Sequence, residues 1–339
     1  MLELDNETAY AAERTVVMNK AGEKSWVVAV KATYRVRMDG TTELSEVQKP
    51  PLYAAEHLGE PGKSSILYET DLIPTKPATD VLVNGQAYAP AGKPAHAVDV
   101  SLRVGPVAKR LRVFGDRHWD VGFLRSLKRS SPAKFERMPI TYERALGGWD
   151  KTDPDPAKQR LYSKNPIGCG FATKAQHLDG RSLPNVEDPS HLISAWKDRP
   201  PPAGFGAIAS YWSPRLEWGG TYNDAWMKNK FPLLADDFDD RFYQAALPDQ
   251  QVSQYLRGGE VVALENLTES GSLQFCLPKV YLTFSTQFGR QKQEHRASLQ
   301  TVVIEPDVPQ VVMVWQTSLA CHHLLDELDV TIIREKRYL

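Results

Sequence analysis

The residues with the most obvious chemical potential are Tyr142, Glu143 and Arg144, in the motif MPITYERALGG at residues 138–148. A carboxylate beside an arginine can act as an acid or base next to a group that stabilises negative charge. On a strand, however, the Glu143 and Arg144 side chains point to opposite faces. We therefore favour a structural role, in which Arg144 pins a neighbouring turn through carboxylate or carbonyl contacts and Tyr142 packs.

Cys169 stands between two glycines in NPIGCGF at residues 165–171, the kind of turn that can expose a nucleophile. No histidine lies at a recognisable family spacing from it, so packing is the preferred interpretation. A hydrolase-like enzyme with a site around Tyr142–Arg144 and Cys169 stays open as the alternative. The three cysteines (Cys169, Cys276 and Cys321) are widely spaced and form no C-x-x-C motif, which fits a reducing compartment.

Metal and cofactor patterns are weak. The DDFDD cluster at residues 236–240 has enough carboxylates for a hard cation but lacks the glycine and distal glutamate of an EF-hand loop. We favour a surface turn paired with Arg241. His322 and His323 are adjacent and cannot share a helix face as a zinc pair does. No dinucleotide, phosphate-loop or nucleophile-elbow motif occurs. The sequence therefore predicts a non-enzymatic protein without metal, cofactor or catalytic residues.

Composition points to a globular protein. At 339 residues and 42% hydrophobic, the chain can bury roughly 75% of its unfolded surface. The net charge of −1 does not favour nucleic acid as a partner. MLELDNETAY at the start has three acids and no apolar run, and no stretch approaches the ~18 apolar residues of a membrane span. We expect a cytoplasmic protein.

Charge is nevertheless segregated. Residues 103–137 hold ten Lys or Arg against three acids, and residues 236–269 hold eight acids against two Arg. The two blocks are either solvated faces that attract each other or a docking surface for a charged partner. Candidate partner-surface residues in the basic block are Arg125, Lys128 and Arg129.

Strand patterns dominate both ends of the chain. Residues 31–38 alternate Lys31, Thr33, Arg35 and Arg37 with apolar side chains up to Met38, which predicts a half-buried strand. Residues 98–104 and 111–113, separated by Gly105-Pro106, predict a hairpin. Further strands are expected at residues 80–88, 260–266, 279–288, 299–305 and 310–317. In the tail, residues 324–328 suit a short helix and residues 330–332 suit a strand.

The middle of the chain reads differently. Frequent prolines between residues 148 and 258 exclude long regular elements. One helix is expected after a capping-box-like start at Thr221, with Tyr222 and Trp226 one turn apart and Pro232 as its stop. Trp196, Trp212, Trp218 and Trp226 are expected to hold this region on the sheets. We predict one mainly β domain (β-rich α+β) over residues 1–339: β-rich 1–147, loop-rich 148–258 and β-rich 259–339. It should contain two packed, mostly antiparallel sheets and one or two short helices.

The turn motifs, taken together, resemble a known family. They are DLIPTKPATDVLVNGQAYAP (71–90), FGDRHW (114–119), MPITYERALGG, NPIGCGF, LPNVEDP (183–189), PAGFG (202–206), GTYNDAW (220–226) and DFDDRFYQAALPDQ (237–250). In this order they resemble, over residues 20–290, a bacterial family of formerly unknown function whose genes lie beside those for type VI secretion spike and toxin proteins. The resemblance implies an adaptor or chaperone that binds a toxic effector protein in the cytosol and promotes its loading onto the spike protein.

It implies no established catalytic residues, and a structural component of the secretion apparatus is the remaining alternative. The N-terminal and tail segments, where the match is weakest, are where effector choice could differ. The candidate motif residues are Arg117, Trp119, Tyr142, Glu143, Arg144, Asn165, Asn185, Tyr222 and Trp226.

Overall fold

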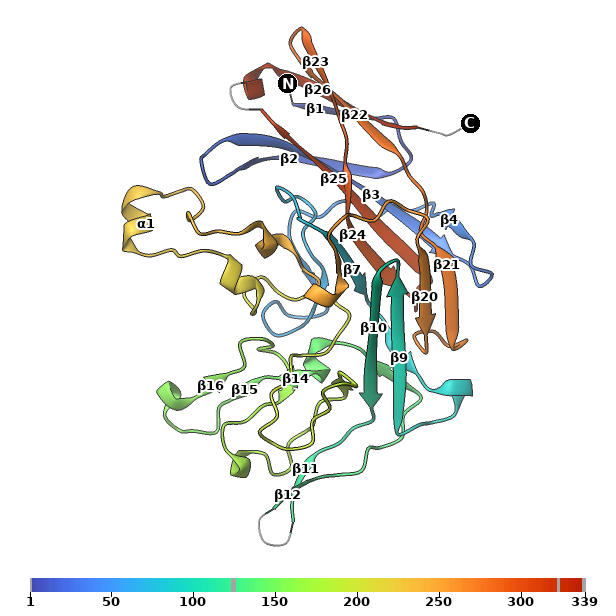
Figure 1. Ribbon diagram of the computed structural model, residues 1–339, viewed down its shortest axis with the longest axis vertical. Helices are drawn as coiled ribbons and strands as arrows, with labels where there is room; N and C mark the ends of the chain where they lie inside the picture. Colours follow the sequence, from blue (N-terminus) through green and yellow to red (C-terminus); the bar gives the residue numbers. More distant parts are fainter. Residues whose placement is uncertain (1, 123–125, 322–323, 337–339) are drawn as a thin grey trace.

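The fold is dominated by strands in a computed structural model that describes residues 2–122, 126–321 and 324–336 (Figure 1). The largest sheet has seven strands in the order β19-β7-β24-β25-β3-β2, with β4 beside β3. Its strands are β2 (Ala11–Met18), β3 (Lys24–Val36), β4 (Thr42–Leu44), β7 (Thr79–Val83), β19 (Gln251–Val252), β24 (Ser298–Glu305) and β25 (Gln310–Ala320).

Two further sheets pack with it. The five-stranded sheet has the order β18-β10-β9-β20-β21, and the four-stranded sheet, at the top of Figure 1, has the order β1-β26-β22-β23. Their strands are β9 (Ala97–Val104), β10 (Val107–Phe114), β18 (Val186–Glu187), β20 (Val261–Glu265), β21 (Ser272–Cys276), β1 (Glu3–Asn6), β22 (Leu282–Phe288), β23 (Gln291–His295) and β26 (Leu328–Glu335).

Short elements complete the described chain. The two-stranded pairs are β5 (Glu56–His57) with β6 (Ile66–Tyr68), β8 (Gln86–Tyr88) with β13 (Arg137–Pro139), β11 (Trp119–Val121) with β12 (Leu127–Arg129), β14 (Leu146–Gly147) with β17 (Cys169–Gly170), and β15 (Trp149–Asp150) with β16 (Arg160–Leu161). The α-helix is α1 (Asp224–Asn229), and 3₁₀ turns lie at Pro90–Gly92, Tyr142–Arg144, Pro156–Lys158, Ala175–His177, Arg215–Trp218, Asp240–Tyr243, Pro248–Gln250 and Leu324–Glu327. The predicted mainly β fold is confirmed, with its longer strands divided among three sheets.

One face of the seven-stranded sheet is apolar. Val81, Val302, Met313 and Ala32 are register partners across β7, β24, β25 and β3, and all are buried. Together with inward side chains of the other two sheets they form one continuous apolar cluster. Alternation of side chains along each strand places this face against the other sheets.

The opposite face of the same sheet is also buried, but it mixes charged side chains with the apolar Leu82, Val303 and Val312. The adjacent row of register partners is Asp80, Thr301, Val314 and Lys31. Lys31 pairs with Asp71 at 2.8 Å, and Asp80 with Lys76 at 2.8 Å. Loop segments therefore cover this face and neutralise its charges.

The predicted strand at residues 31–38 is corrected by this arrangement. Lys31 and Thr33 are buried, not solvated. A covering loop supplies Asp71, which pairs with Lys31, and the Thr33 backbone N–H donates to the Gln48 side chain. Met38 is 70% exposed, because the strand ends at Val36. Burial on both faces is what a central strand under a loop layer experiences.

Other sequence predictions hold at the level of elements. The hairpin is β9–β10, turning at Gly105 with φ 52°. The strand expected at residues 80–88 is two strands, β7 and β8. The tail holds both a 3₁₀ turn at Leu324–Glu327 and the strand β26.

The middle region is loop-rich, as expected. Its strands are two residues long each. The helix α1 is present, but Asn223 caps it by accepting from the Trp226 N–H at 3.0 Å, whereas Thr221 bonds Asp237 instead. Trp212 is fully buried with Leu82 and Val312 of the large sheet, which confirms the stapling role for this tryptophan.

Candidate functional site

Tyr142–Arg144 forms a 3₁₀ turn, not a strand, and its side chains reach three different segments. Tyr142 is buried, and its hydroxyl donates to the Gly206 carbonyl at 3.2 Å. Its ring meets Trp212 edge to face, with the centroids 5.5 Å apart. Tyr142 therefore ties this turn to the loop that covers the large sheet, which confirms that it packs.

Glu143 and Arg144 hold separate loops. The Glu143 carboxylate accepts from the Ser65 backbone N–H at 2.7 Å and from the Ser65 hydroxyl at 2.5 Å. Burial by itself raises the pKa of Glu143, but the hydrogen bonds to its carboxylate, led by those from Ser65, together lower the pKa below its usual range. Arg144 donates to Asn185 Oδ1 at 3.1 Å and lies 3.6 Å from Asp116. Both charges thus serve to position neighbouring turns.

Asn165 explains why two motifs are rich in glycine. It is fully buried, and its amide donates to the carbonyls of Tyr142 at 2.7 Å and Leu146 at 3.1 Å. A Cβ at Gly147 would lie 2.1 Å from the Asn165 carbonyl oxygen, so a side chain cannot fit there. This close approach allows β14 and β17 to pair in parallel, with Leu146 opposite Cys169.

Arg117 and Trp119 are buried anchors of the next loop. Arg117 donates to the Pro184 carbonyl at 2.7 Å and to the Glu187 carboxylate, and its guanidinium lies 3.8 Å from the Phe114 ring centroid. Trp119 packs in a small apolar cluster that includes Leu178 and Leu183. Both residues fix the loop rather than face solvent.

Asn185 joins these loops and borders a cleft of about 800 Å³, here named the polar cleft. Its amide donates to Asp116 at 2.9 Å, and its backbone N–H donates to the Arg144 carbonyl at 2.8 Å. The cleft is lined by Asp116, Arg117, His118, Glu143, Arg144, Cys169, Asn185 and neighbouring residues. The fold therefore gathers four predicted motif residues, Arg117, Glu143, Arg144 and Asn185, around one cavity together with Cys169.

Cys169 lines the polar cleft as a protonated thiol. Burial raises the pKa of Cys169 to about 11, with Arg144 and Arg117 acting weakly in the opposite direction. The thiolate is the nucleophilic form, so a thiol with this pKa is poorly reactive near neutral pH.

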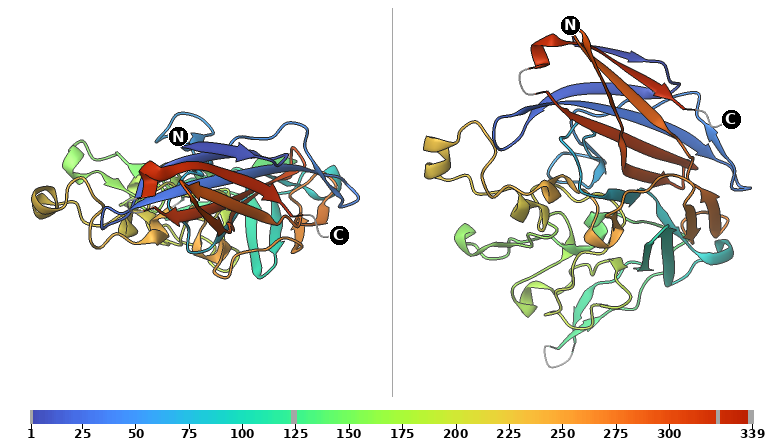
Figure 2. Two further views of the ribbon diagram at one scale, coloured as in Figure 1. Left: turned by 90° about the horizontal axis from the view of Figure 1, so that it is seen from above. Right: turned by 45° about the horizontal axis from the view of Figure 1, so that its top comes forward.

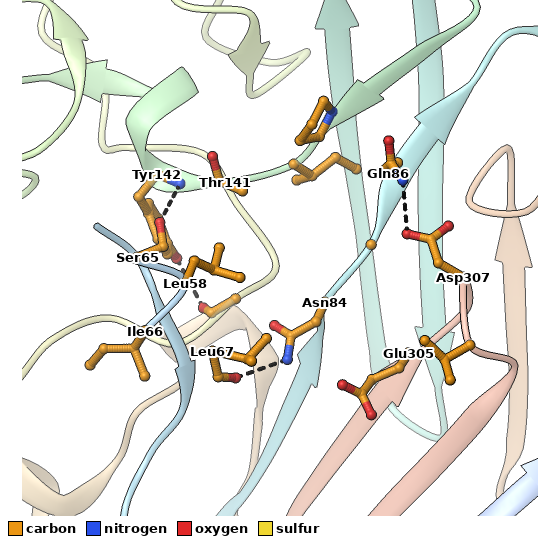
Figure 3. Close-up of a pocket in the computed structure, with 15 residues that line it drawn as sticks. Leu58, Ser65, Ile66, Leu67, Asn84, Gln86, Thr141, Tyr142, Glu305 and Asp307 are labelled. Carbon is orange, nitrogen blue, oxygen red and sulfur yellow. Dashed lines mark hydrogen bonds between the residues drawn. The ribbon is translucent and has the colours of Figure 1, made fainter. Parts of the chain in front are cut away.

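A second pocket, of about 420 Å³, borders the same turn and is here named the apolar pocket (Figure 3). Its apolar lining comes from Leu58, Ile66, Leu67, Pro139, Ile140 and Val308. Hydrogen bonds set its walls: Asn84 donates to the Leu67 carbonyl at 2.8 Å, and Gln86 to Asp307 at 3.2 Å. A concave, mostly apolar site with a few oriented polar groups suits binding.

Tyr222 and Trp226 do not belong to either cavity. They lie in residues 219–237, here named the arm, which carries α1 and extends away from the sheets (Figures 1 and 2). Their rings meet edge to face, with centroids 4.8 Å apart. The predicted motif residues therefore divide between two loop systems.

The basic candidates lie elsewhere again. Lys128 and Arg129 are exposed on β12, where Arg129 donates to the Ile193 carbonyl at 2.7 Å. Arg125 lies outside the described residues, as do His322 and His323. The basic and acidic blocks meet where Lys109 pairs with Asp249 at 3.0 Å.

The model of a family described as "Uncharacterized protein conserved in bacteria (DUF2169)" matches residues 21–316. The chain belongs to this family. The match spans every motif segment, both cavities and the arm. No curated protein and no solved structure matches the chain.

The DUF2169 match stops short of both ends of the chain. The strands β1 and β26 lie outside it, and they pair with each other in parallel, Glu3 opposite Val330. Within the described residues of this DUF2169 protein, no helix combines the length and apolar character that crossing a membrane requires. The same residues contain no group of three or more His, Cys, Asp or Glu side chains placed to hold a metal.

Two important residues of these loops were not singled out from the sequence. Asp150 is buried and accepts hydrogen bonds from Thr152, Thr173 and His177, so it ties its own turn to the loop at residues 173–177. Ser65 supplies both donors to Glu143. Asp150 ends the motif LGGWD, which was a visible signal, but nothing in the sequence near Ser65 marks its role.

Proposed function

We propose that this DUF2169 protein is a non-enzymatic adaptor that binds a toxic effector protein in the cytosol and promotes its loading onto the spike protein of a type VI secretion apparatus. The motif resemblance described above names the system. The proposed partners are both proteins, and binding them requires neither nucleic acid nor a cofactor.

The observation that carries a binding role is how the motif side chains are used. Glu143, Arg144, Asn165 and Asn185 each form side-chain hydrogen bonds to neighbouring loops. Catalytic groups must be available to a substrate, whereas these groups stabilise a shaped surface.

The apolar pocket is the part of that surface that we assign to effector contact. Leu58 and Val308 stand at its edge and are 53% and 62% exposed. An apolar side chain of the effector that enters the pocket would cover both, and burial of such anchors supplies much of the affinity of protein complexes.

The test compares secretion in the parent strain, a deletion strain and complemented strains. Immunoblots follow each effector and the tube protein in the medium. We expect deletion to block export of one effector while the tube protein is still exported, because an adaptor acts on its cargo. Loss of tube protein as well would indicate a structural component, and unchanged export of every effector would refute the adaptor.

Complementation with pocket variants localises the contact. Leu58→Asp with Val308→Asp should fail to restore export of that effector, whereas Val47→Asp, at a position 81% exposed and outside the pocket lining, should restore it. Restoration by both would remove the pocket from the proposal.

A further inference from the structure

The arm is an ordered projection whose helix, α1, is not stabilised by burial against the sheets. None of the six residues of α1 is buried. Isolated helices this short are unstable in water, because helix nucleation is unfavourable and few hydrogen bonds follow it. Other contacts must therefore hold α1.

Those contacts lie within the arm itself. Asn223 caps the helix, and the Trp226 ring lies between Tyr222, with centroids 4.8 Å apart, and Phe231, with centroids 5.7 Å apart. The Trp226 indole N–H donates to the Leu233 carbonyl at 2.9 Å. Trp226 therefore organises both halves of the arm around one ring.

The base of the arm is fastened to the body. The Thr221 hydroxyl donates to Asp237 at 2.7 Å, and Lys20 donates to the Phe238 carbonyl at 2.8 Å. Phe238 is buried. An element held at its base and along its length loses little conformational entropy when it binds a partner.

The arm presents large apolar side chains to solvent. Tyr222, Met227 and Phe231 are 48%, 59% and 63% exposed. Single exposed apolar residues are ordinary, but three on one short projection form a patch of the residue types that anchor interfaces.

The charges around this patch are mainly acidic. Residues 216–241 contain six acidic and three basic side chains, an excess of three negative charges. Asp236 pairs with Lys230, and Asp239 with Arg241. Among the described residues of this segment, the acids Glu217, Asp224 and Asp240 form no ion pair. Lys228 is the one basic residue of the segment that also forms none. A complementary surface is therefore apolar at its centre and basic at its edge.

We propose that the arm is a preformed docking element that inserts into an apolar groove bordered by Lys and Arg side chains on the effector protein. In naming the effector as its partner, this inference rests on the proposed adaptor function. The arm and the apolar pocket then contact the effector through separate groups of residues.

The first experiment uses a photo-crosslinking amino acid at position 227 of the full chain in its host, with the same substitution at position 38 as the matched control. Met38 is 70% exposed and lies at the end of β3, outside the arm. Mass spectrometry maps the linked segment. The expected result is a link from position 227 to an apolar, Lys- or Arg-flanked segment of the effector. No link above the control, a link to a second copy, or a link to an acidic segment overturns the proposal.

The second experiment measures binding of the purified effector whose export depends on this chain. Met227→Asp should weaken Kd by about tenfold, since it places a carboxylate in an apolar contact. Met38→Asp should leave Kd unchanged. Asp224→Asn with Asp240→Asn should slow association by roughly threefold at low salt and reduce its salt dependence. Wild-type Kd for Met227→Asp overturns the proposal.

The two proposals fail in different ways. If deletion of the gene leaves all effectors exported, but position 227 links to a basic-edged apolar segment of another protein, the adaptor function is refuted while the docking chemistry of the arm stands. If export depends on the chain and Met227→Asp restores it fully, the arm inference fails and the adaptor function stands.

Discussion

The two faces of the seven-stranded sheet are buried by different means. On one face, the row Val81, Val302, Met313 and Ala32 packs against other sheets through shape and apolar area alone. On the other, Asp80 and Lys31 stand in the adjacent row, where Lys76 and Asp71 from covering loops neutralise them.

The difference lies in what each face can specify. Apolar side chains of similar volume substitute for one another in a core, so an apolar face tolerates exchange. A buried ion pair contributes little net stability but tolerates no loss of one partner. The polar face therefore specifies where the covering loops sit, and these loops lead to the apolar pocket through Ser65 and Leu67.

The largest expected effect tests this contrast directly. Asp80 accepts from Lys76 at 2.8 Å, from Gln244 at 2.6 Å and from the Ala245 N–H at 2.8 Å. Asp80→Ala leaves these donors buried without their acceptor and should cost about 3–5 kcal/mol of unfolding free energy. Met313→Leu on the apolar face should cost less than about 1.5 kcal/mol. Denaturant titration measures both, and equal losses would contradict the contrast.

A smaller loss of stability should appear on acidification, through His295, which lies where the four-stranded sheet meets β25. His295 bonds Thr286 at 2.8 Å and Thr317 of β25 at 2.7 Å, joining the four- and seven-stranded sheets. Burial lowers the pKa of His295 from 6.5 to about 4. The unfolded chain therefore binds a proton first as pH falls, so stability is full above pH 6.5 and declines toward pH 4.

The loss attributable to His295 is at most about 3 kcal/mol, with solvent screening reducing it. Denaturant titrations at pH 7.5, 5.5 and 4.5 compare the parent with His295→Gln. We expect the variant to lose less stability than the parent over this interval. An identical decline in both would exclude His295 as a source of the acid sensitivity.

The smallest effects should come from the polar cleft, which lies away from both sheet faces. Arg144 is partly exposed, so Arg144→Ala should cost about 1 kcal/mol through its bond to Asn185. Cys169→Ala should change stability and effector binding by only a few tenths of a kcal/mol, roughly the size of a tolerated surface change. A turnover abolished by Cys169→Ala with the fold intact would favour an enzyme instead.

Local patterns predicted much of this fold. The β9–β10 hairpin follows from alternation on either side of Gly105-Pro106, because both strands and the turn lie in adjacent sequence. The strand containing Lys31 was also visible. The burial of Lys31 could not be predicted, because the alternation of side chains separates two faces but does not show what covers each one. The acid that pairs with Lys31, Asp71, lies forty residues away along the chain.

The sequence predicted which residues of the candidate site matter, but not which partners they contact. The motifs named Glu143, Arg144 and Asn185, yet the partner of Glu143 is Ser65, seventy-eight residues away along the chain. Similarly, Asn223 rather than Thr221 caps α1, because the Thr221 hydroxyl donates to Asp237 in the turn at the base of the arm. Such choices depend on contacts that no short window of sequence contains.

The pairing of the chain ends has a consequence for the order of folding. The sheet partner of β1 is β26, and the register of β3 with β25 sets Trp26 opposite Leu319. During synthesis, the backbone N–H and C=O groups of β1 and β3 cannot pair with β26 and β25 until those last strands have been made. Contacts so distant in sequence slow folding and prolong exposure of apolar strands. We therefore expect a chain that ends before β25 to leave β3 without its main partner strand and the core open.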